Sequence, residues 1–291
     1  RLKTSGLKII MNTYELLKIG STTLKENKIV SFILDSELLL SKVLKKNRQD
    51  LLLNLSQTVS KKDFLKYSNL IHRRSNNEPV AYILNKKEFW SKFFNVTKDT
   101  LIPRPETELM VDKLIKRYKN KKNISILDIG TGSGCIIISL LSELNNSFGV
   151  GIDISHRAIN IAKKNAINHC IDTKIKFLNI SLSRYFNKKY DLIVSNPPYI
   201  SKREFKYLSE DIKKFEPRIA LDGGNDGLDL IKKVIYKTKD ILKINGTLAL
   251  EIGNKQFRKV SKILINNNFK IEFRINDYRD NIRCIIAKKL K

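Results

Sequence analysis

From residue 124 onward, short apolar runs alternate with stretches of helical length, and this alternation constrains the fold more than any other feature. The apolar runs read as strands near 124–130, 148–154, 174–180, 190–196, 246–253, 269–275 and 283–289, and the helical patterns between them near 135–144, 156–169, 227–243 and 255–267. Strands that alternate with helices of this length form βαβ units, whose parallel sheet is buried on both faces. We therefore expect an α/β fold with a doubly wound, mostly parallel seven-stranded sheet.

The residues before this alternation have a different character. In residues 12–76 the apolar side chains recur at helical spacing, which predicts a small bundle of short helices. In residues 78–103 β-branched and aromatic residues alternate around lysine-rich turns, which indicates a hairpin or an extended linker. The predicted domains are thus a helical domain over 11–84, a hairpin linker over 85–104 and the sheet domain over 105–291. Because Met11 is the first methionine, we expect residues 1–10 to precede the folded part.

Composition limits the classes of protein that this chain can belong to. The 291 residues are 42% hydrophobic and 29% charged, which is typical of a globular protein. Fifty-six Lys and Arg residues stand against 29 Asp and Glu residues, a net charge of +27 that would suit a nucleic acid or an acidic protein surface. The excess is spread along the chain in lysine pairs, however, and this favours a solvated basic surface.

The distribution of cysteines and of apolar residues indicates the cellular location of the protein. Cys135, Cys170 and Cys284 are scattered, without the spacing of a metal site or a disulfide framework. No apolar run approaches the roughly 18 residues that a membrane span needs. We expect a cytoplasmic protein with no metal and no membrane partner.

The first site motif is LDIGTGSG at 127–134, where a buried strand runs into three glycines and then a helix. Glycines there permit a tight turn and let a ligand approach the backbone at a helix N-terminus. The second motif is Asp153, which ends the next strand about twenty residues later. A carboxylate at that place can accept both ribose hydroxyls of an adenosine-type cofactor. Glycines needed only for packing, and an acid that only caps a helix, are the alternatives.

The third motif is SNPPY at 195–199, at the end of the fourth strand of the sheet domain. In a doubly wound sheet it lies on the same carboxyl edge as the glycine loop and Asp153. The three motifs together resemble the S-adenosylmethionine-dependent methyltransferases of Rossmann-like fold. Asn-Pro-Pro-Tyr itself resembles the members that methylate a planar amino nitrogen, either adenine N6 of nucleic acids or glutamine N5 of proteins.

A planar amino nitrogen is a poor nucleophile because its lone pair is delocalised. If the Asn196 side-chain oxygen and the Pro197 carbonyl each accept one N–H, they aim the lone pair at the methyl group and stabilise the positive charge that grows on nitrogen. We therefore expect Asn196 and Pro197 to be catalytic, with Pro198 and Tyr199 completing the substrate site and Tyr199 stacking on the planar group.

The rest of the chain, from about residue 78, resembles the peptide chain release factor N5-glutamine methyltransferases. The matching motifs are EPVAYILNKKEFW (78–90), TLIPRPETE (100–108), LDIGTGSGCI (127–136), DLIVSNPPYI (191–200), FEPRIALDGGNDGL (215–228), LEIG (250–253) and DYRDNIRCIIAKK (277–289). The resemblance implies that the substrate is the glutamine of the Gly-Gly-Gln motif of a class 1 release factor, that no nucleic acid is required and that the protein is a monomer. It also implies a set of residues that hold S-adenosylmethionine: Gly130, Thr131, Gly132, Ser133, Gly134, Asp153, Leu182 and Asn196.

One position departs from the family. Where the family usually has an acidic residue near the adenine, this chain has Ser181 and Leu182. Contact with the adenine is therefore expected to be weaker or to come from the backbone. Two other function classes compete with the leading one: a nucleic-acid adenine-N6 methyltransferase, and a basic RNA- or ribosome-binding protein that keeps the fold without the chemistry.

Overall fold

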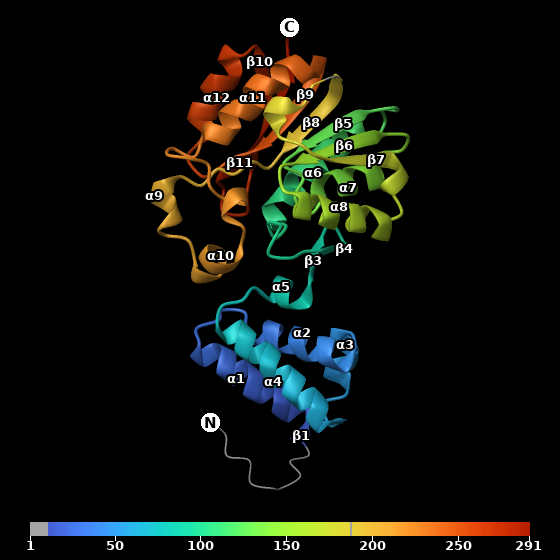
Figure 1. The fold of residues 1–291 in the computed structure, drawn as a ribbon, viewed down its shortest axis with the longest axis vertical. Helices are drawn as coiled ribbons and strands as arrows, with labels where there is room; N and C mark the ends of the chain where they lie inside the picture. Colours follow the sequence, from blue (N-terminus) through green and yellow to red (C-terminus); the bar gives the residue numbers. More distant parts are fainter. Residues whose placement is uncertain (1–10, 187) are drawn as a thin grey trace. The chain divides into compact units, whose positions relative to one another are not determined.

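The computed structural model describes residues 11–186 and 188–291 (Figure 1). The chain divides into two compact units. The first comprises the residues up to Asn85 together with Glu210–Phe215, and the second comprises Lys86–Ser209 and Glu216–Lys291. Residues 1–10, which we expected to precede the folded part, lie outside the described residues.

The N-terminal unit is helical, as its apolar spacing predicts. Its elements are α1 (Thr13–Glu26), α2 (Phe32–Leu44), α3 (Arg48–Leu53), α4 (Lys61–Ser75), α5 (Val80–Leu84) and α10 (Glu210–Phe215), with a short strand pair β1 (Met11–Asn12) and β2 (Thr58–Val59). Asn12 and Ser60 accept hydrogen bonds from the first turns of α1 and α4, which satisfies backbone N–H groups that a helix start leaves unpaired. Leu16, Leu39 and Ile71 are among the side chains of the core that these helices share.

Residues 78–103 follow the expected hairpin only in part. The hairpin itself is present as β3 (Lys86–Phe89) and β4 (Lys92–Asn95), paired antiparallel. Residues 80–84, which the alternation of β-branched and aromatic residues placed in an extended segment, instead form α5. Pro79 precedes this helix, and Asn85 in the left-handed conformation ends it. Burial of Ala81, Tyr82 and Ile83 outweighs the β propensity of this stretch.

The second unit contains the predicted seven-stranded sheet, in the order β10-β11-β9-β8-β5-β6-β7. The strands are β5 (Ser125–Ile129), β6 (Phe148–Asp153), β7 (Ile175–Asn179), β8 (Tyr190–Ser195), β9 (Leu242–Glu251), β10 (Phe269–Asn276) and β11 (Ile282–Lys289). β5 to β9 pair in parallel, and β11 pairs antiparallel with both β9 and β10. β9 begins at Leu242 rather than at Gly246, because Leu242 pairs with Tyr190 of β8. The predicted α/β fold class is confirmed.

Helices cover both faces of this sheet (Figure 1). The helices of the second unit are α6 (Pro105–Tyr118), α7 (Cys135–Glu143), α8 (His156–Asn168), α9 (Lys202–Phe205), α11 (Asp229–Ile241) and α12 (Phe257–Asn266), with short 3-10 turns η1 (Asp172–Lys174), η2 (Leu182–Arg184) and η3 (Arg218–Ala220). Ile126 and Leu192 share one apolar cluster with α6, α7 and α8, whereas Leu127 and Ile193 share another with α11 and α12. Successive residues of each strand thus face opposite layers, which explains why the strands are apolar throughout.

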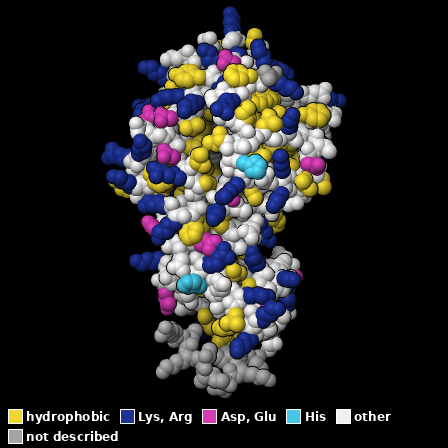
Figure 2. All heavy atoms as spheres, in the orientation of Figure 1, with side chains coloured by type: hydrophobic (Ala, Val, Ile, Leu, Met, Phe, Trp, Pro, Cys, Tyr) yellow, Lys and Arg dark blue, Asp and Glu magenta, His cyan; other side chains and the backbone are white. Residues whose placement is uncertain are grey.

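Basic side chains are dispersed over the face of the molecule that Figure 2 shows. Figure 2 shows the Lys and Arg side chains scattered across the visible face among white and yellow areas, without a single continuous basic patch. This view agrees with the spread of lysine pairs along the sequence. Within residues 11–186 and 188–291, no helix is both long enough and apolar enough to cross a lipid bilayer.

One buried ion pair is expected to stabilise the N-terminal unit. Arg74 Nε donates to Asp35 Oδ2 at 2.6 Å, and their side chains are only 11% and 3% exposed. Replacing Asp35→Ala leaves the Arg74 charge buried and uncompensated, and we expect this to cost about 3–5 kcal/mol of unfolding free energy. Urea denaturation followed by circular dichroism measures it. The control is Lys66→Ala, which removes an exposed pair with Asp63 and should cost less than about 1 kcal/mol; equal losses in the two variants would contradict the prediction.

Candidate functional site

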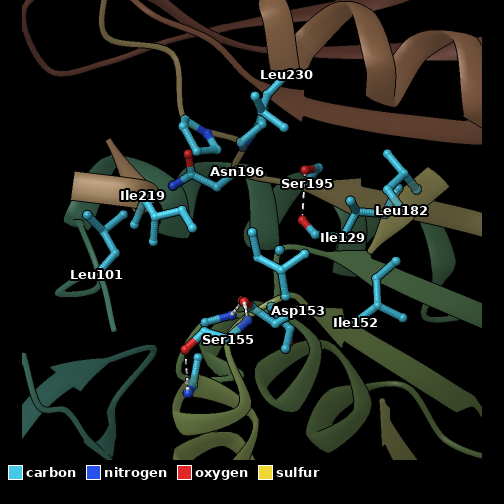
Figure 3. Close-up of a pocket in the computed structure, with 18 of the residues that line it drawn as sticks. Leu101, Ile129, Ile152, Asp153, Ser155, Leu182, Ser195, Asn196, Ile219 and Leu230 are labelled. Atoms are coloured by element: carbon cyan, nitrogen blue, oxygen red, sulfur yellow. Dashed lines mark hydrogen bonds between the residues drawn. The ribbon is translucent and has the colours of Figure 1, made fainter. Parts of the chain in front are cut away.

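A cavity of about 870 Å³ opens at the carboxyl edge of the parallel strands. This volume lies within the range of small-molecule sites in proteins. Nine of the residues predicted from sequence line it: Gly130, Thr131, Gly132, Ser133, Asp153, Leu182, Asn196, Pro197 and Pro198. Figure 3 shows Asn196 toward Ile219 and Leu101 on one side of the view and Leu182 with Ile152 on the other. The sheet topology therefore brings these loops together on one edge, as the three motifs predict.

The glycine loop follows β5 and has a conformation that only glycine adopts freely. Gly130 and Gly132 have φ values of +73° and +56°. A Cβ built on Gly130 would meet no atom within 4 Å, so the backbone there is open to a ligand. The loop is tied to the next strand, because the N–H groups of Gly130 and Thr131 both donate to the Ile152 carbonyl at 2.9 and 3.0 Å.

Gly134 ends this loop at a position where the packing leaves no room for a side chain. It is the N-cap of α7 with φ +80°, and an added Cβ would lie 2.9 Å from the Ile138 side chain and 3.3 Å from that of Ala162. Gly134 is not among the residues that line the cavity. Its predicted contact with the cofactor stays a prediction.

Asp153 lies at the end of β6, beside the glycine loop. Its Oδ2 accepts from the Gly132 N–H at 3.0 Å and its Oδ1 from the Ser155 N–H at 2.8 Å (Figure 3). Burial raises the pKa of Asp153, and these backbone donors oppose that shift. Each carboxylate oxygen can accept a second donor, so Asp153 can still bind hydroxyl groups of a ligand.

The loop after β8 presents free acceptors. Pro197 is buried and Asn196 half-buried, and among the described residues no donor is bonded to the Asn196 side-chain oxygen or to the Pro197 carbonyl. Tyr199 lies differently: it does not line the cavity, and its hydroxyl donates to Glu251 Oε1 at 3.2 Å. The stacking predicted for Tyr199 is untested.

The end of the cavity opposite Asn196 is apolar and contains a pair of hydroxyl groups. Ile152, Ile180 and Leu182 line it, and Ser181 Oγ lies 3.1 Å from Ser183 Oγ. Ser181 and Leu182, which stand where the family usually has an acid, therefore both line the cavity but supply no carboxylate.

Two segments that match the family in sequence, but to which the sequence analysis assigned no role, form the wall of the cavity near Asn196. Leu101, Pro103 and Thr107 come from TLIPRPETE, and Pro217, Ile219 and Ala220 from FEPRIAL. Arg104 Nη2 donates to Glu216 Oε1 at 2.5 Å, and the Ile102 N–H donates to Glu216 Oε2 at 3.4 Å. The Glu216 side chain is almost fully buried, so this carboxylate joins the two loops. The sequence analysis assigned no role to Glu216. Its position next to Pro217, within a motif that matches the family, was the one feature of the sequence that could have indicated a role.

A single side chain connects the β3–β4 hairpin to the glycine loop. Asn165 of α8 is fully buried. Its amide nitrogen donates to the carbonyls of Ser133 at 2.8 Å and Asn95 at 3.0 Å, and its oxygen accepts from the Asn95 N–H at 2.7 Å. Asn165 thus completes backbone hydrogen bonds of both segments.

Asp128, at the end of β5, is a buried acid that sequence reasoning also missed. Its Oδ2 accepts from Thr131 Oγ1 at 2.8 Å, and burial raises its pKa to about 7. The folded state then binds a proton that the unfolded state has released above about pH 4. The contribution of Asp128 to stability is therefore complete below pH 4 and is lost as the pH rises to about 7.

Replacing Asp128→Asn should remove this pH dependence. The unfolding free energy of the variant relative to the original protein should rise between pH 4 and 8, by an amount on the order of 4 kcal/mol. Urea denaturation at a series of pH values measures it. A difference between the two proteins that stays constant with pH would show that Asp128 ionises normally.

Comparison with known proteins agrees with this site. Residues 15–84 match the family model described as PrmC N-terminal domain, and residues 105–214 match the Methyltransferase small domain. The release factor glutamine methyltransferase of Clostridium botulinum is 39% identical over 94% of this chain and 98% of its own length. That of Fusobacterium nucleatum is 41% identical over 91% of this chain and 76% of its own.

Solved structures agree on the fold. A methyltransferase from Pyrococcus furiosus superposes with a TM-score of 0.53 at 16% identity, covering 77% of this chain and all of the other. The catalytic domain of hMettl16, in complex with the MAT2A 3′UTR hairpin 6, gives 0.55 at 16% identity, covering 81% and 85%. At these identities the likeness concerns the fold alone. The sequence relationship carries the assignment, and on that basis the chain belongs to the release factor glutamine methyltransferase family.

Proposed function

We propose that this protein transfers a methyl group from S-adenosylmethionine to the side-chain amide nitrogen N5 of the glutamine in the Gly-Gly-Gln motif of class 1 release factors. Family membership supports the reaction and the substrate. The structural observation that carries the proposal is that Asn196 and Pro197, with no donor on their oxygens among the described residues, line the same cavity as the glycine loop.

The residues present fit S-adenosylmethionine, which supplies the electrophilic methyl group when bound. The open backbone at Gly130 and Gly132 leaves room for the methionine part along the loop. Asp153 would accept the ribose hydroxyls. Leu182 and Ile152 would offer an apolar surface to the adenine. Ser181 and Leu182 stand where the family usually has an acid and supply no carboxylate there. Thr131, Ser133, Gly134 and Asn196 complete the proposed cofactor set.

Asn196 and Pro197 would then hold the substrate amide. Each oxygen accepts one N–H of the glutamine NH₂, so the nitrogen lone pair turns toward the reacting methyl carbon. The same acceptors stabilise the positive charge that develops on the nitrogen during transfer. No general base is needed before transfer, and the nitrogen loses its proton afterwards to water.

The domain roles follow from the same proposal. The helical residues 11–84 would bind the release factor, the hairpin linker 85–104 would connect them to the catalytic residues 105–291, and the enzyme would act as a cytoplasmic monomer without nucleic acid. The match of residues 15–84 to the PrmC N-terminal domain supports this division.

The substrate is tested directly by incubating the protein with methyl-labelled S-adenosylmethionine and a class 1 release factor. We expect label in the release factor, and none after its Gly-Gly-Gln glutamine is replaced by alanine. DNA and RNA serve as competing acceptors in parallel reactions. Label in nucleic acid but not in the release factor would favour the adenine-N6 class instead.

The role of Asn196 is tested by Asn196→Ala. Removing one of two acceptors should lower kcat by ~10²–10³-fold, while the affinity for S-adenosylmethionine, measured by calorimetry, should change little. Asn160→Ala, which alters an exposed asparagine of α8 outside the cavity, is the control and should keep normal activity. Unchanged turnover in Asn196→Ala would refute the assigned role.

A further inference from the structure

The SNPPY loop, which carries Asn196 and Pro197, is held to the rest of the protein by hydrogen bonds of Tyr199. The residue that follows the two prolines, Tyr199, is bonded at two separate points. Its hydroxyl donates to Glu251 Oε1 at 3.2 Å, and its backbone carbonyl accepts from Gln256 Nε2 at 2.9 Å. The Tyr199 ring packs against the apolar cluster of α11, α12 and the sheet. Tyr199 is thus directed into the protein, away from the cavity that Asn196 lines.

Glu251 is the centre of this arrangement. It is the last residue of β9 and is 2% exposed. Its second oxygen accepts from Thr107 Oγ1 of α6 at 2.6 Å. Both oxygens of one buried carboxylate are therefore occupied, one by the first turn of α6 and the other by the SNPPY loop. Burial raises the pKa of Glu251, and Arg283, whose guanidinium lies 5.9 Å from the centre of the Tyr199 ring, opposes that shift.

The backbone of Tyr199 is also enclosed on its other side. A Cβ added to Gly223 would lie 2.8 Å from the Tyr199 Cα, and one added to Gly227 would lie 2.4 Å from the Tyr199 oxygen. Neither position leaves room for a side chain. The Gly227 carbonyl accepts from the same Gln256 amide at 3.2 Å, so the loop of residues 221–228 and the SNPPY loop share one donor.

We infer that Tyr199 and Glu251 are positioning residues, which fix the Asn196 and Pro197 acceptors through the Tyr199 hydroxyl, and that Tyr199 does not stack on the substrate amide. The rigid prolines transmit the position of Tyr199 to Asn196, because their φ angles are fixed. This inference rests on the proposed methyl transfer. It also assigns a role to LEIG and to Thr107 of IPRPETE, which the proposed chemistry leaves without one.

The two possible roles of Tyr199 predict opposite results for one conservative change. Tyr199→Phe removes only the hydroxyl and keeps a ring that can stack. If the hydroxyl positions the loop, kcat for release factor methylation should fall ~10- to 100-fold, because small displacements of reacting groups are costly. The KM values for both substrates should stay within ~3-fold, since ground-state binding is not removed. If the ring stacks, Tyr199→Phe should keep normal kcat.

Two further variants identify the contact. Glu251→Gln loses one of the two acceptor oxygens and should lower kcat similarly. The double variant Tyr199→Phe with Glu251→Gln should be no slower than the slower single variant, because both changes act through one hydrogen bond. The matched control is Tyr118→Phe, which removes another buried hydroxyl, bonded to Thr247 Oγ1 at 2.8 Å, from a residue that does not line the cavity; it should leave kcat unchanged. Thermal unfolding checks that each variant is folded.

The outcomes separate this inference from the proposed function. An active original protein with a fully active Tyr199→Phe variant would overturn the inference alone. Multiplicative losses in the double variant would also overturn it, since Tyr199 and Glu251 would then act independently. Absence of release factor methylation in the original protein itself would overturn the proposed function, and the inference with it. If Glu251→Gln is unfolded, the result for Tyr199→Phe decides.

Discussion

Parallel pairing in the centre of the sheet is the constraint on which the rest of the structure depends. Because β5, β6, β7, β8 and β9 run in the same direction, the loops that follow them all emerge at one edge. The glycine loop, Asp153, Ser181, Asn196 and Glu251 are the residues found there. Reversal of any one of these strands would move its loop to the opposite edge. The site is therefore a consequence of topology before it is a consequence of particular side chains.

Buried carboxylates connect the loops that topology gathers. Glu216 joins the segment before α6 to the segment before η3, and Glu251 joins α6 to the SNPPY loop. A buried acid is costly unless its oxygens are occupied by donors, so each such residue favours one arrangement of the loops around it. The walls of the cavity thereby acquire a definite geometry although they consist mostly of irregular backbone.

Features that depend on residues close together in the sequence could be predicted, whereas features that depend on contacts between distant residues could not. The strands and helices of the sheet domain and the glycine loop could be predicted, because apolar periodicity and glycine spacing are local signals. The α5 helix could not be predicted, because Tyr82 and Ile83 follow their burial rather than their β propensity. Glu216 bonds to Arg104 and Glu251 to Thr107, each more than 100 residues away along the chain, and Glu251 also bonds to Tyr199 52 residues away. No local pattern reveals these partners. The same holds for Tyr199, whose orientation depends on Glu251.

Asn165 has a consequence that concerns mechanics rather than chemistry. This single buried amide carries hydrogen bonds from the hairpin at Asn95 and from the glycine loop at Ser133. A force that displaces the hairpin must either break these bonds or pull the glycine loop with it. Because Asn165 bonds to both segments, a displacement of the hairpin is coupled to the glycine loop through this one side chain.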